Sequence, residues 1–247
     1  MIGAISFHAL ETVYFCQFPN AWPYGRPEEL TVCLTSAYWV LATVPKAALE
    51  PFPMPAPTTT DAPVTVVSGL PRSGTSMMMK MLEAGGMKVL TDKIRTADED
   101  NPKGYYEFER VKQIATDQAW LPEAQGKVVK IISFLLLKAP AGFHYKVIFM
   151  KRALPEVLAS QQQMLIRRGD NSPQDDRRMS ELYEKHLRQA FAWMEAQPNV
   201  DVLYVDHRRA VESPLDVATE VAAFLDTGMD PAVMAAEVDK GLHRQRA

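Results

Sequence analysis

Cysteine, long hydrophobic runs and an excess of positive charge are all scarce in this sequence. Its 247 residues include two cysteines, Cys16 and Cys33, so no disulfide framework or cysteine-rich metal site is available to the rest of the chain. The formal net charge of −3 argues against a nucleic-acid partner held by bulk positive charge. We therefore expect a cytoplasmic protein that binds no nucleic acid and forms any anion site locally.

The longest apolar run, Val32 to Val44, has 13 residues and is broken by threonine and serine. A bilayer-spanning helix needs roughly 18 to 20 apolar residues, so no transmembrane segment is expected. A signal peptide is not expected either, since the first arginine is Arg26. With 47% hydrophobic and 23% charged residues, the composition is that of a globular protein.

Residues 1 to 53 show no sustained helical or strand period, and the proline-rich stretch that follows reads as a linker. We expect residues 1–63 to be an N-terminal extension with its linker, and residues 64–247 to form the main domain. Two interpretations of the extension remain open. Translation starts at Met54 and the extension is not native, or the extension is a small cap that uses the apolar Val32 to Val44 segment.

The most informative stretch joins a predicted strand to a predicted helix. Val64 to Val67 is a β-branched run typical of a buried strand, and the methionine-rich segment after Ser76 has helical spacing that ends at Gly85-Gly86. Between them, Gly69 and Gly74 lie five residues apart. Such a turn lets backbone N–H groups and the N-terminus of the helix converge on an anion.

The loop itself reads Gly69-Leu-Pro-Arg72-Ser73-Gly74-Thr75-Ser76. A nucleotide-binding P-loop carries lysine directly after its second glycine, whereas here Thr75 takes that place and the cation is Arg72. This arrangement resembles the 5′-phosphosulfate loop of sulfotransferases, which bind 3′-phosphoadenosine 5′-phosphosulfate (PAPS). The resemblance implies cofactor contacts from Arg72, Ser73, Gly74, Thr75 and Ser76, with Arg72 also acting in catalysis. A glycine-rich turn without a ligand is the alternative.

A later strand, predicted over Lys146 to Met150, ends in the bases Lys151 and Arg152. A P-loop kinase would need an acidic residue at the end of a core strand to hold magnesium. Arg152 and Ser160 match the sulfotransferase pattern in which these two residues hold the 3′-phosphate of PAPS. Guanidinium and hydroxyl together suit a phosphate dianion. The alternative is a solvated basic strand end.

The stretch Asp100-Asn-Pro-Lys-Gly-Tyr-Tyr-Glu107 resembles an acceptor-side segment of a bacterial group of sulfotransferases. The wider family places a catalytic glutamate after the phosphosulfate loop and its helix, which implies that Glu107 is the general base. Asp206 is a second candidate, while His144 precedes a strand and should lie at the opposite end of the sheet. For Glu107 the alternatives are a plain surface loop or a helix-capping carboxylate.

Strands and helices alternate after Val64, which predicts an α/β fold with a mainly parallel sheet and helices on both faces. The resemblance implies the three-layer sandwich of P-loop nucleoside triphosphate hydrolases. The further strands are predicted over residues 87–90, 127–132 and 202–205. Further helices are predicted over 107–119 and 176–197 and from Pro155, Ser213 and Pro231 onward.

These observations favour a sulfotransferase that moves the sulfuryl group of PAPS to a hydroxyl or amine of a small-molecule or glycan acceptor without a metal. One alternative is a P-loop kinase of a small metabolite, which would need magnesium. The other is a binding protein that keeps the nucleotide site without the chemistry.

Overall fold

The computed structural model describes residues 62–92, 106–170 and 175–239. The predictions made for residues 1–61, and for the acceptor-side segment 100–105, lie outside the described residues. The described elements, in chain order, are β1 (Val64–Gly69), α2 (Thr75–Ala84), a 3₁₀ helix (Glu109–Gln113), α3 (Leu121–Ala124), β2 (Val128–Lys130), α4 (Ser133–Leu136), β3 (Tyr145–Lys151), α5 (Leu154–Arg167), α6 (Asp176–Ala196), β4 (Val200–Asp206), α7 (His207–Glu212), α8 (Pro214–Leu225) and α9 (Pro231–Ala236).

Four parallel strands form one sheet in the order β2-β1-β3-β4. Val67 of β1 is in register with Lys130 of β2 on one side and with Ile148 of β3 on the other. Parallel strands end at the same edge of a sheet, so the residues that follow all four strands meet there. The predicted α/β fold with a parallel sheet is confirmed.

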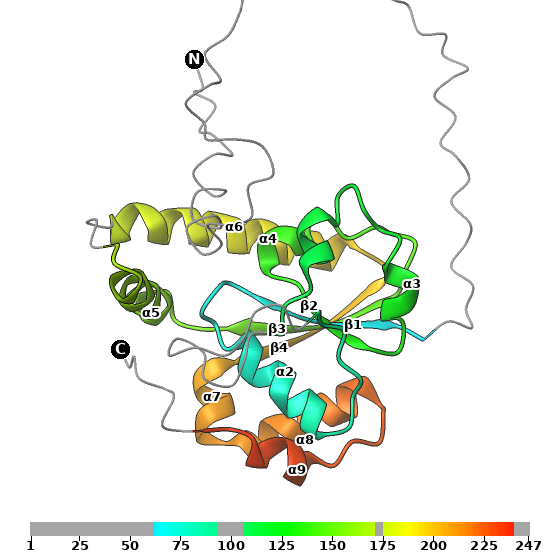
Figure 1. Ribbon diagram of the computed structural model, residues 1–247. Helices are drawn as coiled ribbons and strands as arrows, with labels where there is room; N and C mark the ends of the chain where they lie inside the picture. Colours follow the sequence, from blue (N-terminus) through cyan, green and yellow to red (C-terminus); the bar gives the residue numbers. More distant parts are fainter. Residues whose placement is uncertain (1–61, 93–105, 171–174, 240–247) are drawn as a thin grey trace, which may run out of the picture. The chain divides into compact units, whose positions relative to one another are not determined.

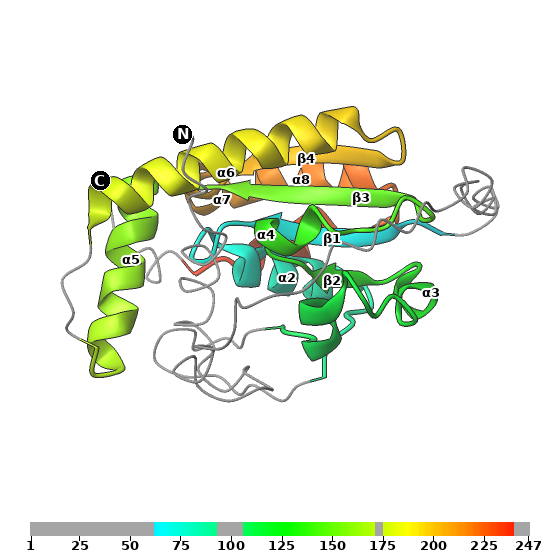
Figure 2. The same ribbon diagram turned by 90° about the horizontal axis from the view of Figure 1, so that it is seen from above.

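Helices cover both faces of this sheet (Figure 1). On one face lie α2, α7, α8 and α9, and on the other lie α3, α4 and α6. Helix α5 lies beyond the carboxyl ends of the strands and packs against α6 (Figure 2). The edge that receives the strand ends is therefore bordered by the loop before α2 and by α5.

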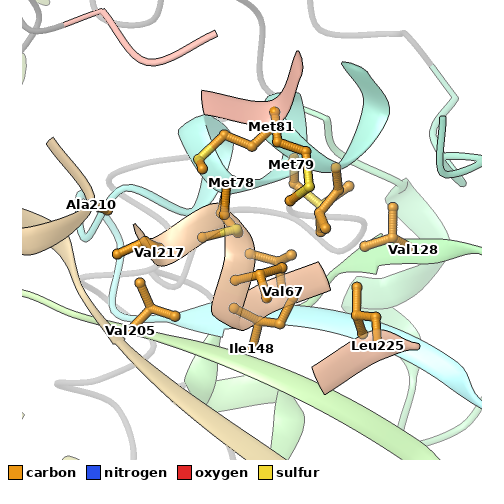
Figure 3. Close-up of a cluster of buried hydrophobic side chains, with 14 of the residues drawn as sticks. Val67, Met78, Met79, Met81, Val128, Ile148, Val205, Ala210, Val217 and Leu225 are labelled. Carbon is orange, nitrogen blue, oxygen red and sulfur yellow. The ribbon is translucent and has the colours of Figure 1, made fainter. Parts of the chain in front are cut away.

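The two central strands, β1 and β3, are largely apolar on both faces because both faces are buried, whereas every residue of the edge strand β4 except Val205 is exposed or half-buried. Val67 and Ile148 point toward α2 and α8, where they meet Met78 and Val217 in one hydrophobic cluster (Figure 3). Their neighbours along each strand point the other way, so that Phe149, for example, belongs to a second cluster under α3, α4 and α6. The period of two along each strand thus builds two cores, one on each side of the sheet.

Carboxylates cap the starts of two helices, and one predicted helix end is confirmed. The Asp175 carboxylate accepts a hydrogen bond from the N–H of Arg178 at the start of α6, and Asp230 accepts one from Ala232 at the start of α9. Gly85 ends α2 as predicted.

Two predicted elements are wrong. The strand at 87–90 is reduced to a single bridge between Val89 and Val128. The helix at 107–119 is replaced by the short 3₁₀ helix Glu109–Gln113 and turns. The carbonyl of Glu107 accepts hydrogen bonds from Thr91 Oγ1 and from the N–H of Asp92, so a tertiary contact takes the acceptor that a helix would use.

Candidate active site

The loop between β1 and α2 folds tightly over the carboxyl edge of the sheet. The N–H of Ser73 donates to the carbonyl of Leu70 at 3.2 Å, and Gly74 begins α2 in the left-handed region with φ of 95°. A Cβ atom at Gly69 would lie 2.7 Å from the carbonyl oxygen of Met150. The loop therefore needs glycine at position 69 for close approach to β3 and at position 74 for its backbone conformation.

The predicted cofactor residues of this loop do not all face the same way. The Ser73 hydroxyl is buried and has no hydrogen-bond partner among the described residues. Thr75 is buried, whereas Gly74 and Ser76 are half-buried where α2 begins. The first turn of this ten-residue helix contains no acidic side chain, so its N–H groups and dipole present positive potential. Ser73 belongs to the interior of the loop, while the other three residues surround the helix start.

The two predicted arginines and Ser160 lie together. Arg72 Nε donates to Ser160 Oγ at 3.1 Å, and Arg152 Nη1 donates to the carbonyl oxygen of Arg72 at 2.9 Å. These contacts join residues that lie 80 or more positions apart in the sequence. The parallel sheet explains the meeting, since Arg72 follows β1 and Arg152 follows the adjacent strand β3.

Arg152 is also held by an acidic residue that the sequence analysis did not single out. Its Nε donates to Glu156 Oε2 at 2.8 Å, and the two side chains are 9% and 7% exposed. Glu156 lies in the first turn of α5, four residues after Arg152. Breaking a buried pair of this kind is costly, because the charge that remains stays buried.

Glu107 lies at the same edge of the sheet, beside the end of β2. Its Oε1 is 3.7 Å from Nζ of Lys130, and the Lys130 and Glu107 side chains are 8% and 14% exposed. Lys130 is the last residue of β2, the strand that neighbours β1. The carboxylate proposed from the sequence as a base is therefore placed at the strand edge by a cation.

The backbone around Glu107 is anchored to two other segments. Thr91 Oγ1 donates to the Glu107 carbonyl at 2.7 Å, and the hydroxyl of Tyr106 donates to Glu83 Oε2 of α2 at 2.5 Å. Burial, followed by the hydrogen bond to Glu83, raises the pKa of Tyr106 above its ordinary value of 10. Helix α2 thus positions both the loop that precedes it and the segment that carries Glu107.

The rival bases lie in other settings. His144 precedes β3 at the opposite end of the sheet, where its Nε2 is 3.1 Å from the carboxylate of exposed Asp201. Asp206 ends β4 at the carboxyl edge, but its Oδ1 accepts from the N–H of Arg209 and so caps α7.

His207, the first residue of α7, packs against the loop between β1 and α2. It is 7% exposed, and a Cβ atom at Gly74 would lie 3.3 Å from its Nε2. The sequence analysis did not single out His207. The contact places the end of β4 within reach of the start of α2.

Lys130 and Glu156 are the residues of this site that sequence reasoning missed. A signal was present for each. Lys130 lies between apolar pairs inside the predicted strand 127–132, and Glu156 lies four residues from a predicted phosphate ligand.

In the part of the chain that the structure describes, no group of three or more His, Cys, Asp or Glu side chains is arranged to hold a metal ion. Within the same residues, no helix has the length and apolar character needed to cross a membrane.

No protein-family model matches the chain, and no curated protein matches it. Among solved structures, the chain is similar to a sulfotransferase domain from the curacin biosynthetic pathway, at 12% identity and a TM-score of 0.46, covering 75% of this chain and 92% of that one. A sulfotransferase domain from the Synechococcus PCC 7002 olefin synthase matches at 15% identity and a TM-score of 0.44, covering 78% of this chain and 91% of that one. A sugar kinase from Janibacter sp. HTCC2649 matches at 12% identity and a TM-score of 0.34, covering 70% of this chain and 98% of that one. Values this low assign the chain to neither group of enzymes.

Proposed function

We propose that this chain is a sulfotransferase that takes the sulfuryl group of PAPS and passes it to an acceptor hydroxyl or amine. The observation that carries the proposal is the meeting of Arg72, Arg152 and Ser160 at the carboxyl edge of the sheet, with contacts of 2.9 and 3.1 Å between them. Two guanidinium groups and a hydroxyl beside a helix N-terminus suit a ligand that carries anionic groups at two points.

The donor set fits the two ends of PAPS. Arg72 and the start of α2 would hold the 5′-phosphosulfate, because they combine a cation with N–H groups and with hydroxyl side chains at Thr75 and Ser76. Arg152 and Ser160 would hold the 3′-phosphate by charge-assisted hydrogen bonds. The glycine at position 69 allows the loop backbone to lie close to β3.

PAPS supplies the activated sulfuryl group when it is bound. The residues of this chain then have two tasks. Positioned donors such as Arg72 stabilise negative charge as it develops on the leaving side, which is where most of the rate gain in such transfers arises. A carboxylate accepts the proton of the acceptor, a contribution of about 10² to 10⁴ in rate.

Glu107 is the carboxylate that we propose for the second task. It lies at the same edge as the arginines, is largely buried, and is anchored by Thr91 through its own carbonyl. Lys130 at 3.7 Å would keep the carboxylate in place before the acceptor enters. A small molecule or a glycan that presents a hydroxyl or amine is the proposed acceptor class.

Calorimetry with nucleotides tests this proposal. The full chain should bind 3′-phosphoadenosine 5′-phosphate more tightly than AMP, because a charge-assisted hydrogen bond contributes about 1.5 to 3 kcal/mol, or about ten-fold or more in affinity. Arg152→Ala should narrow the difference between the two nucleotides. Arg177→Ala is the control, since the Arg177 side chain is 91% exposed on α6.

Equal affinity for AMP and for the 3′-phosphorylated nucleotide would refute the assignment of Arg152 and Ser160. Tight, magnesium-dependent binding of ATP would instead favour the kinase alternative. Binding of the 3′-phosphorylated nucleotide without any turnover of PAPS would favour a binding protein.

A further inference from the structure

Arg72, Arg152, Glu156 and Ser160 form a closed circuit of polar contacts between the loop and α5. Arg72 Nε donates to Ser160 Oγ, Arg152 Nη1 donates to the Arg72 carbonyl, and Arg152 Nε donates to Glu156 Oε2. Glu156 and Ser160 lie four residues apart on α5, so they are neighbours on one side of the helix. The circuit ties the loop that follows β1 to the helix that follows β3.

Arg72 has an unusual backbone conformation within this circuit. Its φ is 68°, in the left-handed region that residues with a Cβ atom seldom adopt. Its side chain is held by Ser160 and its carbonyl by Arg152. Both contacts act on the same residue, so the shape of the loop depends on where Arg152 is placed.

Glu156 has a charge that does not suit a phosphate site. Its carboxylate is 7% exposed and lies 2.8 Å from the guanidinium proposed to hold a phosphate, so by charge alone it opposes an anionic ligand. Its geometry explains its presence. By engaging Nε, it fixes the plane of the Arg152 guanidinium with Nη1 at the Arg72 carbonyl.

We propose that Glu156 is a positioning residue for the loop. It fixes Arg152, and Arg152 in turn holds Arg72 in the left-handed conformation that shapes the loop for the 5′ end of the nucleotide. The two ends of the nucleotide site are then coupled, because Arg152 serves the 3′-phosphate and also supports the loop. The nucleotide part of this inference rests on the proposed function, whereas the effect on the loop does not.

The test compares Glu156→Met with Glu156→Gln, two substitutions of similar length. Glutamine keeps an acceptor for Arg152 Nε and methionine does not. The first readout is the backbone amide signals of Ser73 and Gly74 in ¹⁵N-labelled free protein. The second is calorimetric affinity for AMP, which has no 3′-phosphate and therefore reports on the loop.

We expect Glu156→Met to move the Ser73 and Gly74 signals and to weaken AMP binding by about ten-fold, the effect of one charge-assisted hydrogen bond. Glu156→Gln should leave the loop signals and the affinity for AMP close to those of the native chain. In an Arg152→Met background, Glu156→Met should add nothing further to either readout, because its effect passes through Arg152. Arg152→Lys, which keeps a positive charge beside Glu156 but lacks the guanidinium fork, should also move the loop signals, and it replaces Glu156→Met if that variant does not fold.

Unchanged loop signals in Glu156→Met, or in Arg152→Lys where Glu156→Met does not fold, would overturn the inference. So would tighter AMP binding in both Glu156 variants, since that result would mean that the carboxylate only repels the ligand. An undiminished effect of Glu156→Met in the Arg152→Met background would show a structural role independent of Arg152. If the native chain binds no adenosine nucleotide, the proposed function fails, and the loop signals still decide the role of Glu156.

Discussion

Replacing Gly74 by alanine tests whether the loop is packed against α7 as the structure shows. Gly74 has φ of 95°, and a new Cβ atom would collide with the imidazole of His207, which is 7% exposed. Two costs add in this variant. A residue with a Cβ atom in the left-handed region costs about 1 to 2 kcal/mol, and forcing an extra carbon into a packed site costs about 1 to 3 kcal/mol.

Gly86 provides a matched control for the first of these costs. It has φ of 96°, nearly the same as Gly74, but nothing lies within 4 Å of the position that its Cβ atom would take. Gly86→Ala should therefore lower the free energy of unfolding by the backbone cost alone, about 1 to 2 kcal/mol. Gly74→Ala should lower it by about 2 to 5 kcal/mol, the sum of both costs.

Urea unfolding of the full chain, followed by circular dichroism, measures the difference between the two variants. Adding His207→Ala should relieve part of the loss in Gly74→Ala and none of the loss in Gly86→Ala, because contacting residues couple and distant ones do not. Equal losses in the two glycine variants, with no relief from His207→Ala, would refute the packing of α7 against the loop.

Three further predictions concern other parts of the molecule. Glu107→Gln should keep nucleotide affinity and lower turnover by about 10² or more, whereas the control Glu109→Gln, which removes an exposed pair with Lys112, should leave turnover near normal. Near-normal turnover in Glu107→Gln would exclude Glu107 as the base and make Asp206 the next candidate. His186 is buried with its Nε2 2.9 Å from Ser133 Oγ, and burial lowers its pKa from 6.5 to about 4. The unfolded chain therefore takes up a proton at higher pH than the folded one, so the free energy of unfolding should fall by up to about 3 kcal/mol between pH 6.5 and 4. In urea titrations His186→Gln should flatten this dependence on pH, and an unchanged dependence would contradict the assignment. Lys146 Nζ donates to the carbonyls of Phe224 and Leu225 at the end of α8, so Lys146→Met should lower the free energy of unfolding by about 1.5 to 3 kcal/mol. The control Lys127→Met, which removes a surface ion pair, should change it by less than about 1 kcal/mol. Equal effects of the two variants in thermal unfolding would show that Lys146 does not stabilise the end of α8.

The long and strongly patterned elements could be predicted from the sequence. The β-branched run before the loop is β1, and the apolar stripe of residues 176–197 is α6. Helix α6 has 21 residues, enough for its helical period to stand out from chance, and β1 is recognised by its continuous β-branched run and the glycine that ends it. Alternation of strands and helices then sufficed for the parallel sheet, since few other topologies connect such elements.

The short elements could not be predicted, because tertiary contacts decide them. Helices α4 and α7 have four and six residues, too few to show a helical period. The segment after Glu107 has helical composition, but its first carbonyl is taken by Thr91 and Asp92 from a different part of the chain. No local pattern indicates that competition.

Only part of the candidate site could be predicted, because some of its contacts also depend on tertiary structure. Arg72 and Arg152 each follow a recognisable strand, so the shared edge of a parallel sheet brings them together. The pairing of Lys130 with Glu107 joins β2 to a segment whose backbone is held by Thr91 and Asp92, and no local pattern indicates these contacts. Glu156 was missed because its partner precedes the helix that carries it.

Transfer of label from ³⁵S-labelled PAPS tests the proposed sulfotransferase activity most directly. The full chain is incubated with labelled PAPS and a cell extract, and the labelled products are separated and identified. We predict a labelled acceptor with the native chain, and about 10² to 10³ less labelling with Arg72→Ala, the loss typical of removing one donor to a developing charge. No labelled acceptor from PAPS, together with a product labelled from γ-³²P-ATP and magnesium, would contradict the proposal and identify a kinase.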